Sequence, residues 1–538
     1  MLNKWIKMAA LGMLAVLISF PLAACAPEEA PDEEEAEPEE VDEAVEEPAE
    51  EETFVIARPG DSDILDPNYA TSEEDMDVVF NIYEGLLEFV DEDLNVGPAL
   101  AEDWEMSEDG ETWTFYLRDD VTFHDGTEFN AEAVEFSFMR VLDEDHEYHG
   151  VIDAGWSYLN YLMGDVIEEV RAVDDYVVEF ELNQPFAPFE TYMAYYSQFI
   201  VSPEAVKEHG EEFVNNPVGA GPFKFVEWEY GDYIRLETYD DYYGELPDID
   251  TLIFQNVPEA STRLMEIEAG DAHVAKTVPP EQIDTVEMMD NVELIEVPGA
   301  NLFYIATNTE VEPLDDVRVR RAINHAIDVE RIIAEIYEGT ATRAINALPP
   351  TVFGYDDTAG PYEYDPEKAK ELLADAGYED GFEIQLNTFV YARTYVDHPV
   401  QAAEVIASDL RDVGIETEII TNEWALHSDI QVNMEHELSL TGWFDIPYPS
   451  NFLRTLVLES AYNAYAPEDM LEVSNEAWAT YDEEEQKELY HQMQQRYHED
   501  VPLIPIAHSN YTAAIRGDVD GFVLDTMGIV SARDVSIE

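Results

Sequence analysis

ALAEDWEMSEDGETWTFYLRDDVTFHDGTEFNAEAV, at residues 99–134, is the stretch on which the fold prediction depends most. Its segment TWTFYL, residues 112–117, is rich in β-branched and aromatic residues and predicts a strand. Trp104 and Phe115 supply large apolar side chains for a core, and Gly126 permits a turn that other residues would strain. The stretch therefore predicts a folded scaffold that contains strands.

Further along the chain, predicted strands alternate with predicted helices. Residues 176–182, YVVEFEL, alternate apolar and polar side chains as a half-buried strand does. The segments 202–210 and 365–377 each begin with a capping Ser or Asp followed by Pro and end at Gly, which predicts helices. Gly414 is predicted to end another helix, which includes Leu410. This alternation predicts an α/β architecture.

One more helix is predicted where apolar residues recur at helical spacing. These residues are Val319, Ala322, Ile323, Ala326 and Ile327. Arg318, Arg320 and Arg321 are interspersed among them, and we expect these arginines to lie mostly off the buried face.

The charge of the chain is strongly negative. Its 538 residues include 122 Asp and Glu but only 25 Lys and Arg, which gives a formal net charge of −97. Such a surface repels nucleic acid and anionic lipid. Hydrophobic residues make up 46% of the chain, so we expect folded domains despite this charge. We interpret the composition as an adaptation to high external salt, because a Debye length of about 3 Å at 1 M salt nearly removes self-repulsion.

The N-terminus predicts export and a lipid anchor. Lys4 and Lys7 precede an apolar run that ends in small residues before Cys25, the one cysteine of the chain. A charged start, a short apolar segment and small residues before a cleavage point are typical of a secretory signal peptide, here residues 1–24. Cysteine directly after that point resembles a bacterial lipobox, so we expect Cys25 to carry acyl chains such as palmitate. An ordinary signal peptide and a membrane-spanning anchor are the alternatives.

Residues 25–52 predict a tether and the rest predicts several domains. After Cys25, the tether contains only Ala, Pro, Glu, Asp and Val, so it is expected to be solvated and self-repelling. The body begins near Thr53 and is too long for one core, which predicts two or three domains.

Motifs of common enzymes and metal sites are absent from the sequence. It has no Gly-x-Ser-x-Gly elbow, no phosphate-binding loop and no His-Glu-x-x-His. Histidines such as His325 and His508 occur singly and form no ligand set with cysteine. We therefore predict no enzymatic activity, no metal and no cofactor.

Four stretches together resemble the extracytoplasmic solute-binding proteins of peptide and nickel ABC importers, known as family 5. They are residues 99–134, NPVGAGPF at 216–223, DVRVRRAI at 316–323 and DPEKAKELLADAG at 365–377. The resemblance covers essentially the whole body and is closest to the branch that binds dipeptides and oligopeptides. It implies an α/β periplasmic-binding-protein fold, class II-like, with two lobes, an extra peripheral subdomain and two hinge crossings.

The resemblance also implies the boundaries of these parts. The first lobe is expected at residues 53–307 plus 508–538, with the peripheral subdomain near 90–215. The second lobe is expected at residues 308–507. The hinge crossings are expected near residues 301–308 and 501–510, and the ligand is expected between the lobes.

The same resemblance implies which residues bind the ligand. Asp445, in the segment GWFDIPYPSNFL at 442–453, matches the aspartate that holds a peptide's amino terminus. Arg393 matches the arginine that holds the carboxylate, a task suited to its planar guanidinium. Tyr395, Trp443 and Gly442 are expected beside them.

Asp445, Arg393 and Trp443 also have a purely structural interpretation. Asp445 is otherwise a turn acid, and Arg393 a surface cation paired with Asp397. Trp443 is otherwise part of a core, and Trp424 is expected to serve packing alone.

The prediction of function follows from these observations. The resemblance implies a substrate-binding lipoprotein of an ABC importer, anchored outside the cell membrane, which captures short peptides and delivers them to a membrane permease. We expect a monomer with no nucleic-acid partner. The alternatives are a nickel chelate, haem or an oligosaccharide as ligand, or a peptide sensor without transport.

Overall fold

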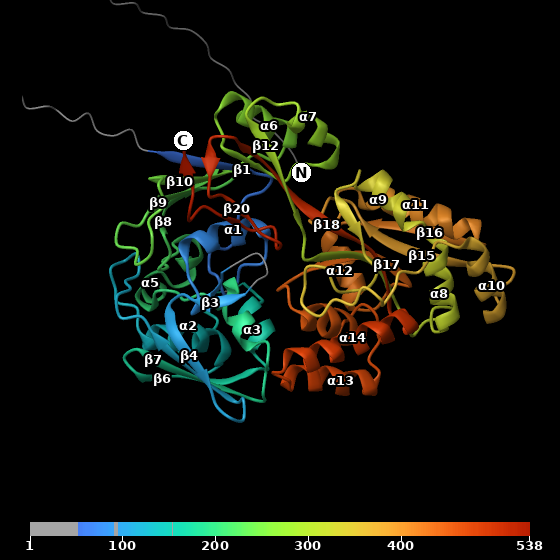
Figure 1. Cartoon of the computed structure of the whole chain (residues 1–538), viewed down its shortest axis with the longest axis horizontal. Helices are drawn as coiled ribbons and strands as arrows, with labels where there is room; N and C mark the ends of the chain where they lie inside the picture. The colour runs from blue at the N-terminus through green and yellow to red at the C-terminus, as the bar shows by residue number, and fades with distance from the viewer. Residues whose placement is uncertain (1–51, 91–94, 153) are drawn as a thin grey trace, which may run out of the picture. The chain divides into compact units, whose positions relative to one another are not determined.

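The computed structural model describes residues 52–90, 95–152 and 154–538 (Figure 1). The predicted signal peptide, the acylation site Cys25 and all but the last residue of the tether lie outside the described residues. Within the described ranges, no helix combines the length and the apolarity needed to cross a bilayer.

A mixed sheet organises most of the strands. In the described part of the chain it has 12 strands. Their order is β16 (Ile415–Asn422), β15 (Phe382–Phe389), β17 (Leu438–Phe444), β13 (Asn301–Thr307), β18 (Leu503–Arg516), β11 (Val274–Lys276), β1 (Thr53–Arg58), β10 (Thr251–Asn256), β9 (Tyr233–Thr238) and β8 (Phe223–Glu229). β12 (Val292–Pro298) and β14 (Ala341–Arg343) pair with β18 outside this order. β1 runs parallel to β10 and β11, and β15 runs parallel to β16 and β17, whereas the other pairings are antiparallel.

Strand β18, drawn in red in Figure 1, takes part in both halves of this sheet. Its residues 503–509 pair with β13 and β14. Its residues 510–516 pair with β12 and β11. β18 changes its pairing partners next to Ser509, whose carbonyl accepts from the amide of Gly299. β18 and the β12–β13 connection therefore pass side by side between the two halves of the sheet.

A second, antiparallel sheet has the order β4-β5-β7-β6. Its strands are β4 (Ala101–Met106), β5 (Thr112–Leu117), β7 (Val177–Leu182) and β6 (Ile167–Asp174). β5 has the predicted bounds, and the strand predicted at 176–182 is β7. Rings of Phe115, Phe138 and Phe180 meet edge to face between this sheet and helix α2 (Ala131–Leu142). Smaller two-stranded ribbons are β2 (Leu87–Phe89) with β3 (Val96–Pro98), β19 (Val519–Asp520) with β22 (Ser536–Ile537), and β20 (Val523–Leu524) with β21 (Val530–Ser531).

The predicted helix boundaries are confirmed where capping residues signal them. The remaining helices are α1 (Glu73–Ile82), α3 (Tyr158–Met163), α4 (Phe189–Met193), α5 (Pro203–His209), α6 (Ala260–Ala269), α7 (Ile283–Glu287), α8 (Val317–Ala326), α9 (Val329–Ile336), α10 (Pro366–Ala376), α11 (Pro399–Asp412), α12 (Trp424–Val432), α13 (Glu468–Ala479) and α14 (Glu483–Asp500). The hydroxyl of Ser202 accepts from the amide of Ala205 at the start of α5, and the carboxylate of Asp365 accepts from Lys368 at the start of α10. Gly377 ends α10 in the left-handed region, with φ +96°.

Arg320 in α8 was expected to lie off the buried face of the helix, but the structure buries it. Its guanidinium donates to the carbonyls of Asp500, Val501 and Leu314. The carbonyls of Asp500 and Val501 lie at the C-terminal end of α14, where helices leave acceptors without internal partners. The arginine therefore stabilises the end of another helix instead of facing solvent.

The buried apolar side chains of the described residues form separate clusters. Two clusters draw all their buried members from residues 300–507. The other two draw theirs from residues 54–286 and 511–535, with Ile446 as the exception. The α/β architecture is confirmed, while the exact lobe boundaries stay a prediction.

Candidate ligand-binding site

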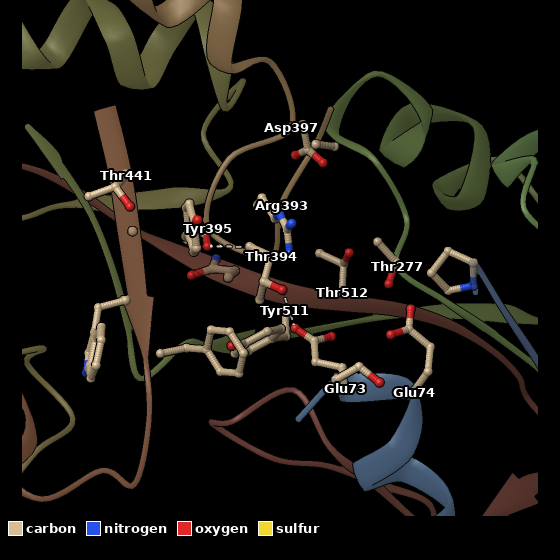
Figure 2. Close-up of a pocket in the computed structure, with 18 of the residues that line it drawn as sticks. Glu73, Glu74, Thr277, Arg393, Thr394, Tyr395, Asp397, Thr441, Tyr511 and Thr512 are labelled. Atoms are coloured by element: carbon tan, nitrogen blue, oxygen red, sulfur yellow. Dashed lines mark hydrogen bonds between the residues drawn. The ribbon is translucent and has the colours of Figure 1, made fainter. Parts of the chain in front are cut away.

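A cavity of about 920 Å³ lies where β17, β18, α1 and the loop before α11 meet. This volume is near the upper end of the range of about 300–1,000 Å³ found for small-molecule sites. Figure 2 shows Arg393, Thr394 and Tyr395 on the loop, with Glu73 and Glu74 on the side of α1. Segments far apart in the sequence thus supply one continuous lining.

Arg393 lines this cavity and has no anionic partner among the described residues. Its guanidinium carbon lies 3.9 Å from the ring centroid of Trp424. Among the described residues, every other arginine makes a side-chain hydrogen bond or ion pair, whereas Arg393 makes neither. Burial lowers the pKa of Arg393, and the negative charge of Glu74 partly offsets this. In a chain with 122 acidic residues, a cation held over a ring and left unpaired is ready to receive an external anion.

Tyr395 and Gly442 fit together beside Arg393. A Cβ atom on Gly442 would lie 2.2 Å from ring carbons of Tyr395, so only glycine lets this ring lie against β17. The same ring stacks on Phe303 with centroids 6.3 Å apart. The hydroxyl of Tyr337 donates to the carbonyl of Tyr395 at 2.7 Å. Gly442 therefore fixes the loop that carries Arg393.

Trp443 and Asp445 follow Gly442 along the chain. Trp443 lines the cavity, and its buried Nε1 has no hydrogen-bond acceptor among the described residues. Asp445 is not in the lining and is only 3% exposed. Its Oδ1 accepts from the hydroxyl of Tyr158 at 2.6 Å and from the amide of Ile446 at 2.7 Å. Its Oδ2 is buried without a partner in the described part of the chain.

The environment of Asp445 disfavours its charged form. Burial raises the pKa of Asp445 to about 7, and the hydrogen bonds from Tyr158 and Ile446 only partly oppose this. A cation placed at Oδ2 would supply the missing partner and restore the ionised form.

The structure brings four of the five predicted ligand residues to the cavity lining. These are Arg393, Tyr395, Gly442 and Trp443. The fifth, Asp445, reaches the lining through Tyr158, which is itself a lining residue. The arrangement offers a positive group and a nearly buried negative group at one cavity.

The family model for bacterial extracellular solute-binding proteins, family 5, matches residues 95–464. The chain is a family 5 solute-binding protein. The resemblance predicted from the four sequence stretches is confirmed by this match.

The relatives of this solute-binding protein are named for different ligands, including dipeptides and haem. The dipeptide-binding protein of Escherichia coli K12 is 36% identical over 507 residues, which cover 90% of this chain and 95% of that protein. Heme-binding protein A of Haemophilus influenzae is 35% identical and covers 85% of this chain and 87% of its own. A solved structure, the periplasmic binding protein DppA of Helicobacter pylori in complex with the peptide STSA, has a TM-score of 0.78 at 31% identity. It covers 90% of this chain and 98% of its own, and this agreement supports the predicted periplasmic-binding-protein fold.

Glu73 and Glu74, which the sequence did not single out, also line the cavity of this solute-binding protein. Glu73 lines the cavity, accepts a hydrogen bond from the hydroxyl of Thr394 and lies 3.7 Å from Nζ of Lys276. Lys276 donates to Asp77 at 2.7 Å. Burial raises the pKa of Glu73 to about 7, against the opposing effect of Lys276. One of the dashed contacts in Figure 2 joins Glu73 on α1 to Thr394 on the loop that carries Arg393.

Trp424 and Tyr158 are two further residues whose place at the site was not predicted. Trp424 was expected to serve packing alone, but it lines the cavity and carries Arg393 on its ring. The only sequence signal was its position after Glu423 in a Glu-Trp pair. Tyr158 gave no signal, because its partner Asp445 is 287 residues away.

Proposed function

We propose that this solute-binding protein captures a short peptide by its two charged ends. The observation that supports the proposal most is the pair of unmatched groups at one cavity. Arg393 has no anionic partner, and Oδ2 of Asp445 is buried without a donor among the described residues. Arg393 is exposed to the cavity, whereas Oδ2 of Asp445 is buried. Burying a charge without a partner is costly, so this carboxylate oxygen is typical of a site completed by a ligand.

Arg393 receives the peptide carboxylate in this proposal. Its planar guanidinium can donate two parallel hydrogen bonds to a carboxylate. The guanidinium carbon lies 3.9 Å from the ring centroid of Trp424, and this contact restrains the side chain, so less freedom is lost when the ligand binds.

Asp445 receives the peptide ammonium in this proposal. Oδ1 stays engaged by Tyr158 and Ile446, and Oδ2 accepts from the ammonium. Because the positive charge favours the carboxylate, binding near neutral pH releases a proton from the part of the population in which Asp445 is protonated.

The wider role rests on the family. We propose that lobes at residues 53–307 plus 508–538 and 308–507 close over the peptide, with a peripheral subdomain near 90–215. The protein then acts as a monomer without catalysis, is anchored outside the membrane through acylated Cys25, and presents the peptide to an ABC permease.

Haem, a nickel chelate and an oligosaccharide are the alternative ligands. Arg393 and Oδ2 of Asp445, which have no partner in the described part of the chain, favour a zwitterion over all three. Within the described residues, the cavity lining contains no histidine, cysteine or methionine. Tyrosine is the only common haem-iron ligand that the lining offers.

The test measures binding of Ala-Leu by calorimetry, together with its N-acetylated and C-amidated forms. Blocking either end should weaken binding by about tenfold or more. Removing one partner of a desolvated charge pair typically costs about 2–5 kcal/mol of binding free energy. In Asp445→Asn, N-acetylation should bring little further loss, whereas C-amidation should still weaken binding. In Arg393→Gln the pattern should be reversed.

The exposed Asp240 supplies the control variant Asp240→Asn, which should bind all three peptides as wild type does. Equal binding of the free and the end-blocked peptides by the wild-type protein would overturn the proposal. The proposal would also be overturned if the protein bound haemin and none of the peptides.

A further inference from the structure

We infer that Trp156, Tyr158 and Tyr161 form an aromatic wall that selects peptides whose first residue is aromatic. This inference rests on the proposed function, because it takes Asp445 as the site of the peptide ammonium. It adds a side-chain preference that the charged ends alone do not give.

The three rings of the aromatic wall contact one another. Trp156 lies 5.2 Å from Tyr158 in an edge-to-face arrangement and 5.3 Å from Tyr161, measured between ring centroids. Tyr158 and Tyr161 are 6.0 Å apart. These distances are typical of attractive aromatic pairs, so the wall holds its shape without a ligand.

The aromatic wall is open to the cavity. All three residues are in the cavity lining, yet Trp156 is 46% exposed and Tyr161 is 42% exposed. Neighbouring exposed aromatic side chains are uncommon on a soluble surface and usually mark a binding site. The exposed aromatic side chains also contrast with the composition of the chain, which has 122 acidic residues.

The hydrogen bond between Tyr158 and Asp445, which joins distant parts of the chain, leaves the rings of Trp156 and Tyr161 uncovered. The hydroxyl of Tyr158 already donates to Asp445 across 287 residues of sequence, and Trp156 and Tyr161 remain about half exposed in the same structure. The exposed faces are therefore available to a ligand after this contact has formed.

The aromatic wall lies next to the group that is to hold the ammonium. Tyr158 belongs to the wall and donates to Asp445. The charge of Asp445 also adds to the effect of burial in raising the pKa of Tyr161, so this ring is within electrostatic reach of the carboxylate. Trp443, Phe444 and Tyr462 are among the other aromatic residues of the lining.

Peptide stereochemistry connects the two features. The ammonium and the first side chain leave the same carbon atom, so a peptide whose ammonium contacts Asp445 must place its first side chain near the aromatic wall. An aromatic side chain would bury more apolar area there than any other and would pair with the rings edge to face.

The test compares Phe-Ala, Ala-Ala, Lys-Ala and Ala-Phe by calorimetry on the wild-type protein and on the double variant Trp156→Ala/Tyr161→Ala. Phe-Ala should bind the wild type about tenfold more tightly than Ala-Ala, since an aromatic pair and its buried area together are worth more than one factor of ten. The double variant should lose this preference, so that it binds Phe-Ala no more tightly than it binds Ala-Ala. The two substitutions should weaken the binding of Phe-Ala far more than the binding of Ala-Phe.

Two single variants serve as controls. Tyr161→Phe keeps the ring and should keep the preference for Phe-Ala. Tyr364→Ala removes a ring that is 43% exposed but outside the cavity lining, and should change nothing.

The outcomes separate this inference from the proposed function. If all four peptides bind the wild type equally, or if the double variant keeps the preference, the aromatic wall has no selective role and only this inference is overturned. Tighter binding of Lys-Ala than of Phe-Ala also overturns it. If none of the four peptides binds, the proposed function is overturned and this inference with it.

Discussion

The substitution Asp445→Asn should stabilise the peptide-free protein at alkaline pH. Asp445 is only 3% exposed, and its Oδ2 has no partner among the described residues. Burial raises its pKa from the ordinary 3.8 to about 7. Above pH 7 the folded protein must therefore keep a charge where the surroundings disfavour one.

The magnitude follows from the shift in pKa. About three pKa units correspond to about 4 kcal/mol, at about 1.4 kcal/mol for each unit. Between pH 4 and pH 7 the folded protein binds more protons at this site than the unfolded chain, so the free energy of unfolding falls as the pH rises through this window. Above pH 7 the loss is complete and constant.

Asparagine removes the charge but brings a cost of its own. It keeps an oxygen for Tyr158 and Ile446, but it places an amide N–H group where Oδ2 has no partner. An unsatisfied buried donor costs about 1–3 kcal/mol. The net stabilisation at pH 8 should therefore be about 1–3 kcal/mol. At pH 4 the native carboxyl is neutral, so only the cost of the amide remains and the variant should be no more stable than wild type.

Thermal unfolding of the peptide-free protein at pH 4, 6 and 8 tests this reasoning. The melting temperature of Asp445→Asn should exceed that of wild type at pH 8, with a difference that shrinks as the pH falls. Asp240→Asn, at an exposed position, should show no such trend. A lower melting temperature for Asp445→Asn than for wild type at pH 8, or a difference independent of pH, would show that Asp445 is not destabilised by its charge.

Further predictions concern pH, the cation, the glycine and salt. Peptide affinity should fall by up to about tenfold per pH unit below pH 7, because the ammonium needs ionised Asp445, and calorimetry of Asp445→Asn should show no such slope. Trp424→Leu should weaken peptide binding by about 2- to 30-fold through loss of the ring under Arg393, and an unchanged affinity would contradict this. Gly442→Ala should lower the free energy of unfolding by about 1–3 kcal/mol, because its Cβ would lie 2.2 Å from the ring of Tyr395, and denaturant unfolding measures this. The melting temperature should rise between 0.1 M and 3 M NaCl as the net charge of −97 is screened, and equal values would reject the salt adaptation.

Elements with local signals could be predicted closely from the sequence. The strand at residues 112–117 and the helix that starts after Asp365 and stops at Gly377 have the predicted bounds. Their signals are strand composition and capping residues, which act within a few positions of the chain.

Features that depend on distant partners could not be predicted. Arg320 was expected off the buried face, but it is buried because acceptors at residue 500 and residue 501 reach it from another helix. Gly442 has an ordinary strand pairing, and only the ring of Tyr395 explains why a side chain is excluded there. Such contacts follow from tertiary packing, for which a single sequence gives no spacing rule.

The candidate site falls between these cases. Arg393 stood out in the sequence because cations are rare in this chain and aromatic residues surround it. Its lack of an acidic partner and its support by Trp424 appear only in three dimensions. For Asp445, the resemblance gave the position, whereas its burial and its partner Tyr158 required the structure.

The place of β18 in the chain has a consequence for biosynthesis. This strand, residues 503–516, separates β13 from β11 in the sheet order and follows both of them in the sequence. A nascent chain emerging from the ribosome therefore cannot complete either half of the large sheet until this late segment has left the exit tunnel. Premature termination before residue 503 would leave two incomplete sheets with open edges, which are prone to aggregation and open to proteases.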